Sequence, residues 1–312
     1  IDVAVLERVF DDKGIAVIPG FQGVADDGSV STLGRGGSDT SAVALAVAMK
    51  ADRCDIYTDV DGVYTTDPRI VPRARKLDIV TYEEMLELAS VGAKVLQTRS
   101  VGLAMRENMP VRVLSSFEEP DESRPAGTRR GTMIVGEDYM QSREAQGKNM
   151  ERQLITGIAY DKNEARISLI GLSDKPGTVA AIFAPLAAAN INVDMIVQSV
   201  AREGEKRDLT FTVPTAALAH SVDALTQAKD EIGFEEILTD SNVVKVSAVG
   251  VGMRSNAGIA ARMFEALADR GIRILAIATS EIKVSVLIPE EYTELAVRVL
   301  HTAYGLDAES DA

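Results

Sequence analysis

The sequence predicts an α/β chain with a largely parallel sheet in its first half and two ferredoxin-like βαββαβ units in its second half. Two observations carry this prediction. Strand-like and helix-like segments alternate through the first half, and the second half matches itself at a nearly constant offset. The 312 residues suit two or three domains, and the 46% hydrophobic and 26% charged composition is that of an ordinary globular protein.

In the first half, short apolar runs that end at Pro-Gly or Asp-Gly indicate buried strands, and an Ala-rich segment indicates a helix. Strands that alternate with helices in this way are typical of a parallel sheet with crossover helices. In chain order we expect a helix over 1–13, a strand over 15–19, a helix over 39–50, a strand over 54–60, helices over 82–90 and 94–107, and a strand over 110–114.

A domain boundary is expected after this region. Residues 116–131 are rich in Glu, Pro, Asp, Ser, Gly and Arg, which indicates a loop, and residues 136–152 are polar and weakly patterned. The predicted domains are therefore 1–140, a linker over 141–152, a first repeat over 153–238 and a second repeat over 239–312.

The repeat is visible in the alignment of residues 166–200 with residues 245–281. Gly177 matches Gly258 and Phe183 matches Phe264, both at a spacing of 81 residues. Each copy predicts a strand, a Gly-containing turn, an amphipathic helix and a second strand. Further strands are expected over 207–213 and 282–288, and further helices over 216–228 and 290–304.

Composition excludes several function classes. The net charge of −14 disfavours nucleic-acid binding, because phosphate backbones attract basic surfaces. With Cys54 as the single cysteine and two histidines, neither a disulfide framework nor a zinc or His-based metal site is expected, and we predict no metal ligands. No run of 18 apolar residues and no signal peptide is visible, so a reducing cytoplasm is the expected location.

The strongest motif is TLGRGGSDTSA at residues 32–42. Its three glycines allow the backbone to approach a ligand closely, and a helix that begins near Ser38 offers free N–H groups and a positive dipole end to an anion. Arg35 can clamp a carboxylate or phosphate with two N–H groups. The alternative is a glycine turn with a Ser N-cap, which the embedded Arg and Asp make less favoured.

A second motif, TDVDGVYTTDPR at residues 58–69, follows a predicted strand and therefore lies at the carboxyl edge of the sheet, where α/β folds bind ligands. Asp-Gly and Asp-Pro turns explain part of it, but an aromatic and a cation beside polar groups could hold a nucleotide. A third segment, VGAKVLQT, carries Lys94, which without context is more simply a solvated lysine.

The chain has neither the Walker pattern nor the protein-kinase signatures. It resembles the aspartate kinases in GFQGV at 20–24, TLGRGGSD at 32–39, TDVDGVYTTDPR at 58–69, EEMLELASVGAKVL at 83–96 and the two repeats, over essentially its whole length. The resemblance implies an amino-acid-kinase (carbamate-kinase-like) α/β domain, incomplete at its N-terminus, followed by two ACT domains.

The implied activity is ATP-dependent phosphorylation of the L-aspartate side-chain carboxylate to 4-phospho-L-aspartate, with Mg²⁺ on the nucleotide, as the first step of lysine, threonine and methionine biosynthesis. By matching motif, the implied substrate and catalytic positions are Arg35, Gly36, Gly37, Ser38 and Asp39. The implied ATP contacts are Ser38, Thr58, Asp59, Tyr64, Thr65, Thr66, Asp67, Pro68, Arg69 and Lys94.

Within these sets, the resemblance gives Arg35 the grip on the substrate α-carboxylate, Ser38 a place near the transferred phosphate, and Asp39 the orientation of a catalytic lysine. The family's N-terminal Lys-x-Gly-Gly segment, which carries that lysine, is absent here, as is the downstream Glu that binds the substrate amine. Residues 1–13 read as a helix already under way. We therefore expect a truncated chain with little or no kinase activity alone.

The resemblance also implies feedback by lysine, threonine or both at the ACT domains, with lysine favoured and threonine acting in concert. The implied effector contacts are Asp174, Lys175, Pro176, Gly177, Thr178, Val179, Asn192, Val193, Asp194, Gln198, Ile259, Ala260, Arg273, Ile274, Ser280 and Glu281. Two departures leave the effector open: Arg273 stands where related lysine-plus-threonine enzymes carry Asn, and Asn256-Ala257 stands where the first repeat has Lys175-Pro176. ACT pairing implies a homodimer, a higher homo-oligomer or an assembly of α and β subunits.

Two other functions remain open. The chain could be a regulatory, non-catalytic amino-acid-binding subunit or fragment, although intact glycine and TDVDGVYTTDPR loops argue against degeneration. It could also act on another carboxylate such as glutamate. Fusion to a homoserine dehydrogenase is disfavoured, because no GxGxxG segment occurs before the C-terminal GLDAESDA.

Overall fold

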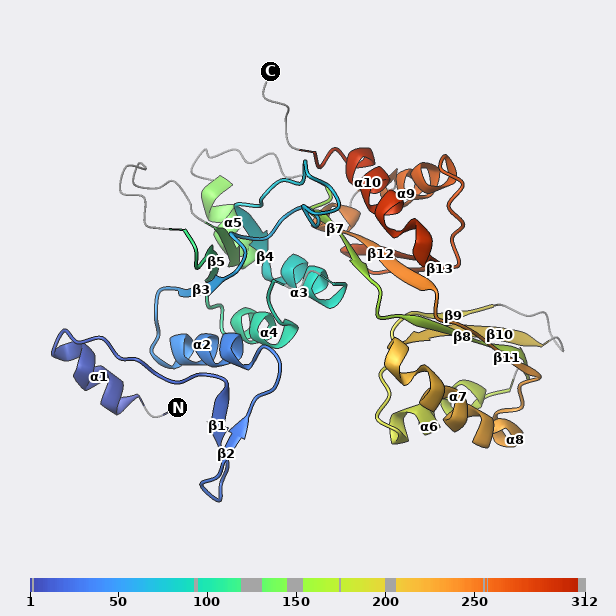
Figure 1. The fold of residues 1–312 in the computed structure, drawn as a ribbon, viewed down its shortest axis with the longest axis horizontal. Helices are drawn as coiled ribbons and strands as arrows, with labels where there is room; N and C mark the ends of the chain where they lie inside the picture. The colour runs from blue at the N-terminus through green and yellow to red at the C-terminus, as the bar shows by residue number, and fades with distance from the viewer. Residues whose placement is uncertain are drawn as a thin grey trace. The chain divides into compact units, whose positions relative to one another are not determined.

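The computed structural model describes residues 1, 3–92, 95–118, 131–144, 154–173, 175–199, 206–254, 256 and 258–307. The chain divides into two compact units (Figure 1). The first contains residues 1–157, 249–252 and 306–312, and the second contains residues 158–248 and 253–305. Each unit is described below by itself.

The first unit is a mixed α/β structure (Figure 1). Its helices are α1 (Ala4–Asp11), α2 (Gly37–Ala48), α3 (Tyr82–Ser90), α4 (Thr98–Arg106) and α5 (Glu137–Glu144). Its strands are β1 (Gln22–Val24), β2 (Val30–Thr32), β3 (Cys54–Thr58), β4 (Ile79–Thr81), β5 (Val111–Ser115) and β6 (Thr132–Val135).

The main sheet of this unit has the strand order β3-β5-β6-β4. The pairs β3/β5 and β4/β6 are parallel, and β5/β6 is antiparallel. The predicted largely parallel sheet is thus confirmed for the described strands, and β1 and β2 form a separate antiparallel hairpin. Parallel pairing requires crossovers, and the chain between the parallel partners β3 and β5 contains helices α3 and α4.

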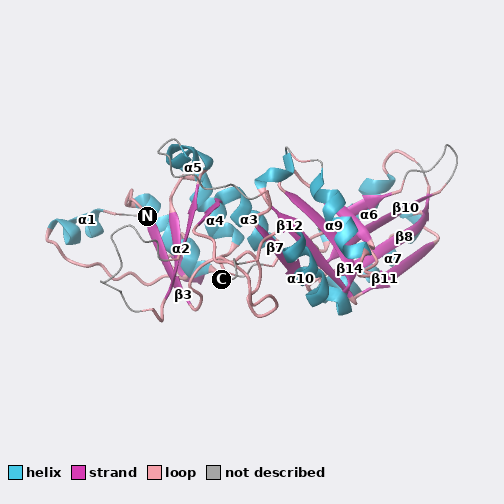
Figure 2. Cartoon of the chain, turned by 90° about the horizontal axis from the view of Figure 1, so that it is seen from above, coloured by secondary structure: helices cyan, strands magenta, loops and turns pink. Residues whose placement is uncertain are grey.

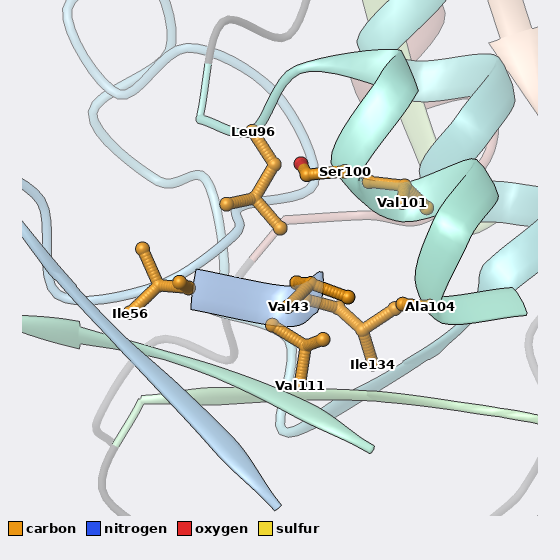
Figure 3. Close-up of a pocket in the computed structure, with 8 residues that line it drawn as sticks. All are labelled: Val43, Ile56, Leu96, Ser100, Val101, Ala104, Val111 and Ile134. Carbon is orange, nitrogen blue, oxygen red and sulfur yellow. The ribbon is translucent and has the colours of Figure 1, made fainter. Parts of the chain in front are cut away.

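An apolar core holds the helices of the first unit to this sheet. Figure 3 shows Val43 of α2 lying among Ile56, Val111 and Ile134 of the strands, with Leu96 and α4 closing the other side. These side chains pack too tightly to admit a water molecule. Val43 is 1% exposed, so α2 is held tightly against the sheet. The glycine loop of residues 34–37 leads directly into this helix.

The second unit contains both repeats. Its helices are α6 (Thr178–Ala188), α7 (Leu218–Gln227), α8 (Lys229–Ile232), α9 (Gly258–Ala268) and α10 (Thr293–Ala303), with 3₁₀ turns η1 (Thr215–Ala217) and η3 (Glu290–Tyr292). A third 3₁₀ turn, η2 (Val251–Arg254), begins in the first unit and ends in the second. Its strands are β7 (Gly157–Asp161), β8 (Ala165–Leu172), β9 (Ile196–Gln198), β10 (Arg207–Val213), β11 (Glu236–Asp240), β12 (Val243–Val249), β13 (Ala276–Thr279) and β14 (Lys283–Pro289). Figure 2 shows both sheets in magenta, with α9 and α10 packed against each other.

The two sheets of this unit have the orders β11-β8-β10-β9 and β13-β14-β12-β7. Strand β7 precedes the first repeat in sequence, yet it pairs with β12 of the second repeat. The predicted domain limits place residues 157–161 with the first repeat and cut β11 at residue 238, whereas β11 pairs along its length with β8. The sheet of the second repeat is therefore completed by a strand that comes before the first repeat, which periodicity alone does not reveal.

The core of the first repeat follows from strand alternation. Ile167 and Leu169 of β8 and Leu209 and Phe211 of β10 are almost fully buried, and they pack against Leu186 of α6. The Phe183 and Phe211 rings meet edge to face, with centroids 5.4 Å apart.

Most predicted elements are confirmed, but the buried strand over 15–19 is wrong. These residues form no strand, and Ile15 and Val17 are 89% and 92% exposed. An apolar run becomes a strand only where a neighbouring strand accepts its hydrogen bonds, and no described segment does so here. The prediction also omits strands β1, β2, β4, β6, β7 and β11 and helices α5 and α8. Met140 of α5 packs on Ile79 and Val135. Among the described residues, no helix is both long and apolar enough to cross a membrane.

Candidate functional site

The glycine loop reaches helix α2 through two residues in the left-handed region. Gly34 has φ of 74° and Gly36, the N-cap of α2, has φ of 71°. A Cβ on Gly37 would lie 2.8 Å from the Leu33 side chain and 3.0 Å from the Phe21 ring. The close spacing of the glycines therefore has a steric reason, as the motif suggested.

Two residues that sequence reasoning missed hold this loop in place. The Arg99 guanidinium donates from Nη2 to the carbonyl oxygens of Leu33 and Arg35, both at 3.0 Å. The Gln97 side chain lies where a Cβ on Gly36 would sit, 1.8 Å from its Cγ. Gln97 lies within the VGAKVLQT segment and Arg99 directly follows it, and no pattern in the sequence links them to a loop about sixty residues earlier.

The glycine loop presents positively charged and N–H groups at the N-terminus of α2. The Arg35 side chain is exposed and has no hydrogen-bond or ion-pair partner among the described residues. Among the described residues, the backbone N–H groups of Ser38 and Asp39 at the start of α2 donate to no carbonyl oxygen. A free guanidinium beside an open helix N-terminus can receive a carboxylate or phosphate.

Asp39 is the anionic member of this loop. Burial raises the pKa of its carboxyl, although hydrogen bonds from the Ser38 hydroxyl and the Gln97 backbone N–H oppose the shift. The Ser38 hydroxyl lies 3.4 Å from Asp39 Oδ1. A carboxylate that is costly to leave half-buried and charged is suited to holding a cation, such as an ammonium group.

The second predicted loop begins at the carboxyl end of β3. The Ser116 backbone N–H and hydroxyl both donate to the Thr58 carbonyl, at 2.8 and 2.9 Å, and the Thr58 hydroxyl donates to exposed Asp59. Further along, the Tyr64 hydroxyl donates to Asp61 at 3.0 Å, and Lys76 pairs with the same carboxylate at 2.9 Å. Burial, followed by this hydrogen bond, raises the pKa of Tyr64 to about 12, so the phenol stays a donor.

The end of the same loop contains one unsatisfied group. Thr65 is fully buried, and its hydroxyl accepts from the Arg75 N–H at 2.9 Å. Thr66 is 5% exposed, and its hydroxyl oxygen has no hydrogen-bond partner among the described residues. A buried hydroxyl without a partner carries a free-energy cost that a bound polar ligand could remove.

Asp67, Pro68 and Arg69 complete the loop. Asp67 caps the turn that follows, because it accepts from the Arg69 backbone N–H at 2.9 Å. It also forms a forked ion pair with the Arg69 guanidinium, which is 88% exposed. Pro68 is exposed. The structure thus gives Arg69 a neighbouring anion, and Lys94 lies outside the described residues.

The predicted effector positions 175–179 of the first repeat lie at the start of α6. Gly177 caps this helix with φ of 95°, and a Cβ there would meet open space. The Thr178 hydroxyl donates to the Ser173 carbonyl at 3.1 Å. Lys175, Pro176 and Val179 are exposed beside it, and Asp174 lies outside the described residues.

Asp194 has a partner that the sequence did not indicate. Lys245 of β12 is 4% exposed and pairs with both Asp194 and buried Glu164, the latter at 2.5 Å. Burial raises the pKa of Glu164, whereas Lys245 holds the pKa of Asp194 below its ordinary value although burial opposes this. The carboxylate expected to receive an effector ammonium is therefore already neutralised by the second repeat.

The edges of the two repeats meet next to Asp194. Met195 and Val197 pack with Ala276 and Leu287 in one apolar cluster. Gln198 on β9 pairs with Leu209, while Asn192 is exposed and Val193 is half-buried against the first-repeat core. This cluster brings the 192–198 segment beside β13 of the second repeat.

The second-repeat positions are more scattered. Ile259 is 5% exposed and belongs to the packed face of α9, where its carbonyl accepts from the Tyr304 hydroxyl at 2.8 Å. Ala260 follows it on α9, and Ile274 is half-buried. Arg273 is exposed and lines an open groove of about 950 Å³ together with Asp240 and Glu290. The remaining two positions, Ser280 and Glu281, lie in the exposed turn between β13 and β14.

Comparisons with known proteins agree with this architecture. The amino acid kinase family model matches residues 1–115, and ACT domain models match residues 166–232 and 246–304. An aspartokinase of Pseudomonas aeruginosa is 53% identical over 294 residues, which cover 94% of this chain and 67% of that protein. The chain belongs to the aspartokinase family. A Helicobacter pylori aspartokinase is 48% identical over 98% of this chain and 72% of its own length.

Solved aspartokinase structures have the same fold. E. coli aspartokinase III in complex with aspartate and ADP, in its R-state, has a TM-score of 0.74 at 29% identity, over 96% of this chain and 62% of that one. The same enzyme in complex with lysine and aspartate, in its T-state, has a TM-score of 0.69 at 30% identity over the same shares. The chain thus spans roughly two-thirds of the aspartokinases it matches.

Proposed function

We propose that this chain supplies the nucleotide loop, part of the aspartate site and the regulatory half of an aspartate kinase, which transfers the γ-phosphoryl group of ATP to the side-chain carboxylate of L-aspartate. Such transfer needs positioning and charge neutralisation, not a covalent intermediate. Arg35 binds the α-carboxylate of aspartate, the N-terminus of α2 with Ser38 faces the transferred phosphate, and Asp39 orients an ammonium group.

The observation that carries the proposal is the free Arg35 guanidinium on a glycine loop that opens onto the N-terminus of α2. Arg99 and the Gln97 side chain hold this loop before any ligand arrives, so little ordering entropy remains to be lost on binding. Membership of the aspartokinase family makes an amino-acid carboxylate the natural occupant.

The second loop fits a nucleotide. Its proposed contacts are Thr58, Asp59, Tyr64, Thr65, Thr66, Asp67, Pro68 and Arg69, and the later VGAKVLQT segment adds Lys94. The partnerless hydroxyl of buried Thr66 supports this assignment, because a nucleotide polar atom would satisfy it. E. coli aspartokinase III is solved with ADP, and by analogy ATP enters here as its Mg²⁺ complex. Arg69 then exchanges part of its pairing with Asp67 for the ligand.

The two repeats sense amino acids. Lysine is the favoured effector, since E. coli aspartokinase III is solved in a T-state complex with lysine, and threonine acts in concert with it. The proposed contacts are those around Gly177, Asp194 and Gln198 in the first repeat and around Ile259, Arg273 and Glu281 in the second. Pairing of ACT units between two chains makes the functional form a homodimer.

Equilibrium binding to the 312-residue chain tests the substrate half of this proposal. Isothermal titration calorimetry should detect binding of MgADP, and of L-aspartate in its presence. Arg35→Met should weaken L-aspartate binding about 10- to 100-fold, because a charge-assisted hydrogen bond contributes about 1.5–3 kcal/mol, and should leave MgADP binding unchanged. Arg35→Lys is the matched control; it keeps the charge without the fork and should fall between the two.

Three outcomes separate the alternatives. Binding of L-glutamate as tightly as L-aspartate would assign the site to another carboxylate. If the chain binds lysine but binds neither MgADP nor L-aspartate, a regulatory, non-catalytic role is favoured. Equal L-aspartate affinity in the wild type and Arg35→Met would remove Arg35 from the substrate site.

A further inference from the structure

Glu84 is a buried carboxylate with two separate sets of donors. It is 6% exposed and stands at the third position of α3. Its Oε2 accepts from the Thr81 backbone N–H at 3.1 Å and from the Thr81 hydroxyl at 3.0 Å, while the same hydroxyl accepts from the Glu84 N–H at 3.2 Å. This reciprocal pair is a capping box, which the Thr-x-x-Glu spacing makes visible in the sequence.

The other oxygen of Glu84 leaves the helix. Oε1 accepts from the Thr156 hydroxyl at 2.6 Å and more weakly from the Val251 backbone N–H at 3.4 Å. Thr156 is 72 residues away in sequence and Val251 is 167 residues away. A capping box needs one oxygen only, so these contacts are additional. All of these residues belong to the first compact unit.

The Thr156 segment is clamped against the peptide that leads into α9. The Thr156 N–H donates to the Val249 carbonyl at 2.7 Å, and the Gly252 N–H donates to the Leu154 carbonyl at 3.1 Å. A Cβ on Gly250 would lie 2.4 Å from the Leu154 carbonyl oxygen. The two backbones are therefore as close as glycine permits, and neither can shift without moving the other.

On its other side the segment touches the nucleotide loop. A Cβ on Gly157 would lie 2.8 Å from the Thr65 carbonyl oxygen and 3.4 Å from Leu88 of α3. Thr65 is fully buried in the proposed nucleotide loop. Residues 154–157 thus lie between that loop and the 249–252 peptide, which is covalently continuous with the second-repeat helix that carries Ile259 and Ala260.

We propose that Glu84 is the positioning residue through which effector binding at the ACT repeats alters the nucleotide loop, an inference that rests on the proposed function. One oxygen of its carboxylate holds the start of α3, and the other holds Thr156 and Val251. A displacement of the 249–252 peptide pulls on Oε1 and thereby on α3, whose C-terminal end leads to Lys94. The partner side chain that transmits the change is Thr156.

A coupling measurement tests this relay, since proximity alone does not establish it. The Kd of MgADP for the 312-residue chain is measured with and without saturating L-lysine plus L-threonine. In the wild type the effectors should change it about 5- to 150-fold. Thr156→Val, which removes only the hydroxyl and leaves the capping box intact, should bring this factor close to 1. Thr156→Ser, the matched control, keeps the hydroxyl and should keep the coupling.

If Thr156 had only a structural role, Thr156→Val would lower the stability of the fold without changing the effect of the effectors on the Kd of MgADP. As a control, the Kd of MgADP alone and the Kd of the effectors alone are measured on both variants. Both values should match those of the wild type. Wild-type coupling retained in Thr156→Val would overturn the relay. Binding of both ligands to the wild type without coupling would overturn it as well. Absence of binding by either ligand would overturn the proposed function and the relay together.

Discussion

Replacement of Gly36 by Ala separates two reasons for a glycine at the N-cap of α2. Gly34 and Gly36 have nearly the same left-handed φ, 74° and 71°. A Cβ on Gly34 comes no closer than 3.9 Å to Arg99, whereas a Cβ on Gly36 would lie 1.8 Å from Gln97 Cγ and 2.6 Å from Gln97 Cβ. Gly34→Ala is thus a matched control for backbone conformation alone.

The expected magnitudes differ accordingly. A left-handed conformation costs an alanine about 1–2 kcal/mol, which is the whole cost expected for Gly34→Ala. Gly36→Ala adds the displacement of Gln97, and overpacking of this kind costs about 1–3 kcal/mol. We therefore expect losses of about 1–2 kcal/mol for Gly34→Ala and about 2–5 kcal/mol for Gly36→Ala.

Urea denaturation followed by circular dichroism measures both losses, with the unfolding of the first unit fitted as its own transition. Gln97→Gly supplies a second control, because Gln97 is the N-cap of α4 without a side-chain capping bond and glycine at an N-cap costs only a few tenths of a kcal/mol. The double variant Gly36→Ala/Gln97→Gly should recover to the Gly34→Ala level. Equal losses for the two alanine variants, or no recovery in the double variant, would refute the steric argument.

Three further predictions concern charge, reactivity and packing. Burial raises the pKa of Asp55, but hydrogen bonds and charge from Arg112 and Arg53 outweigh this effect and hold the pKa below its ordinary value of 3.8. The folded state therefore binds fewer protons than the unfolded state. The stability that this group contributes is lost as the pH falls through the folded pKa. The excess stability of the wild type over Asp55→Asn, measured as Tm, should therefore be present at pH 6 and shrink below about pH 4; a constant difference would contradict this. Burial raises the pKa of Cys54 to about 11, so the native thiol should resist a disulfide reagent at pH 8 and react after denaturation; rapid native labelling would count against the buried site. Phe211→Ala should cost about 3–5 kcal/mol, and a loss under 1 kcal/mol would show that the Phe183–Phe211 core is loosely packed.

The sequence predicted what depends on local pattern. The glycine turn at Gly177, strand β8 and the helix after the glycine loop all follow from spacing within a few residues, and each is present. The 58–69 motif also lies directly after β3 and the glycine motif directly before α2, as predicted. Their chemistry stays a prediction, because exposure and missing partners show availability rather than occupancy.

Contacts between residues far apart in the sequence could not be predicted. Lys245 meets Glu164 from 81 residues away, and β7 joins a sheet that no periodicity assigns to it. Gln97 and Arg99 look like ordinary helix residues until the fold brings them onto the glycine loop. In each case the contact depends on tertiary packing, and local patterns in a single sequence do not show which distant residues come together. Glu84 is intermediate: the Thr81-x-x-Glu84 spacing of its capping box can be read from the sequence, although it was not predicted, whereas the contacts of its second oxygen cannot.

The most direct test of the central claim is the position of L-aspartate in a crystal of this chain grown with MgADP and L-aspartate. We predict that the α-carboxylate of aspartate lies about 3 Å from the Arg35 guanidinium, with ADP along the loop of residues 58–69. Aspartate density found only within the ACT repeats, with no ligand at Arg35, would contradict it.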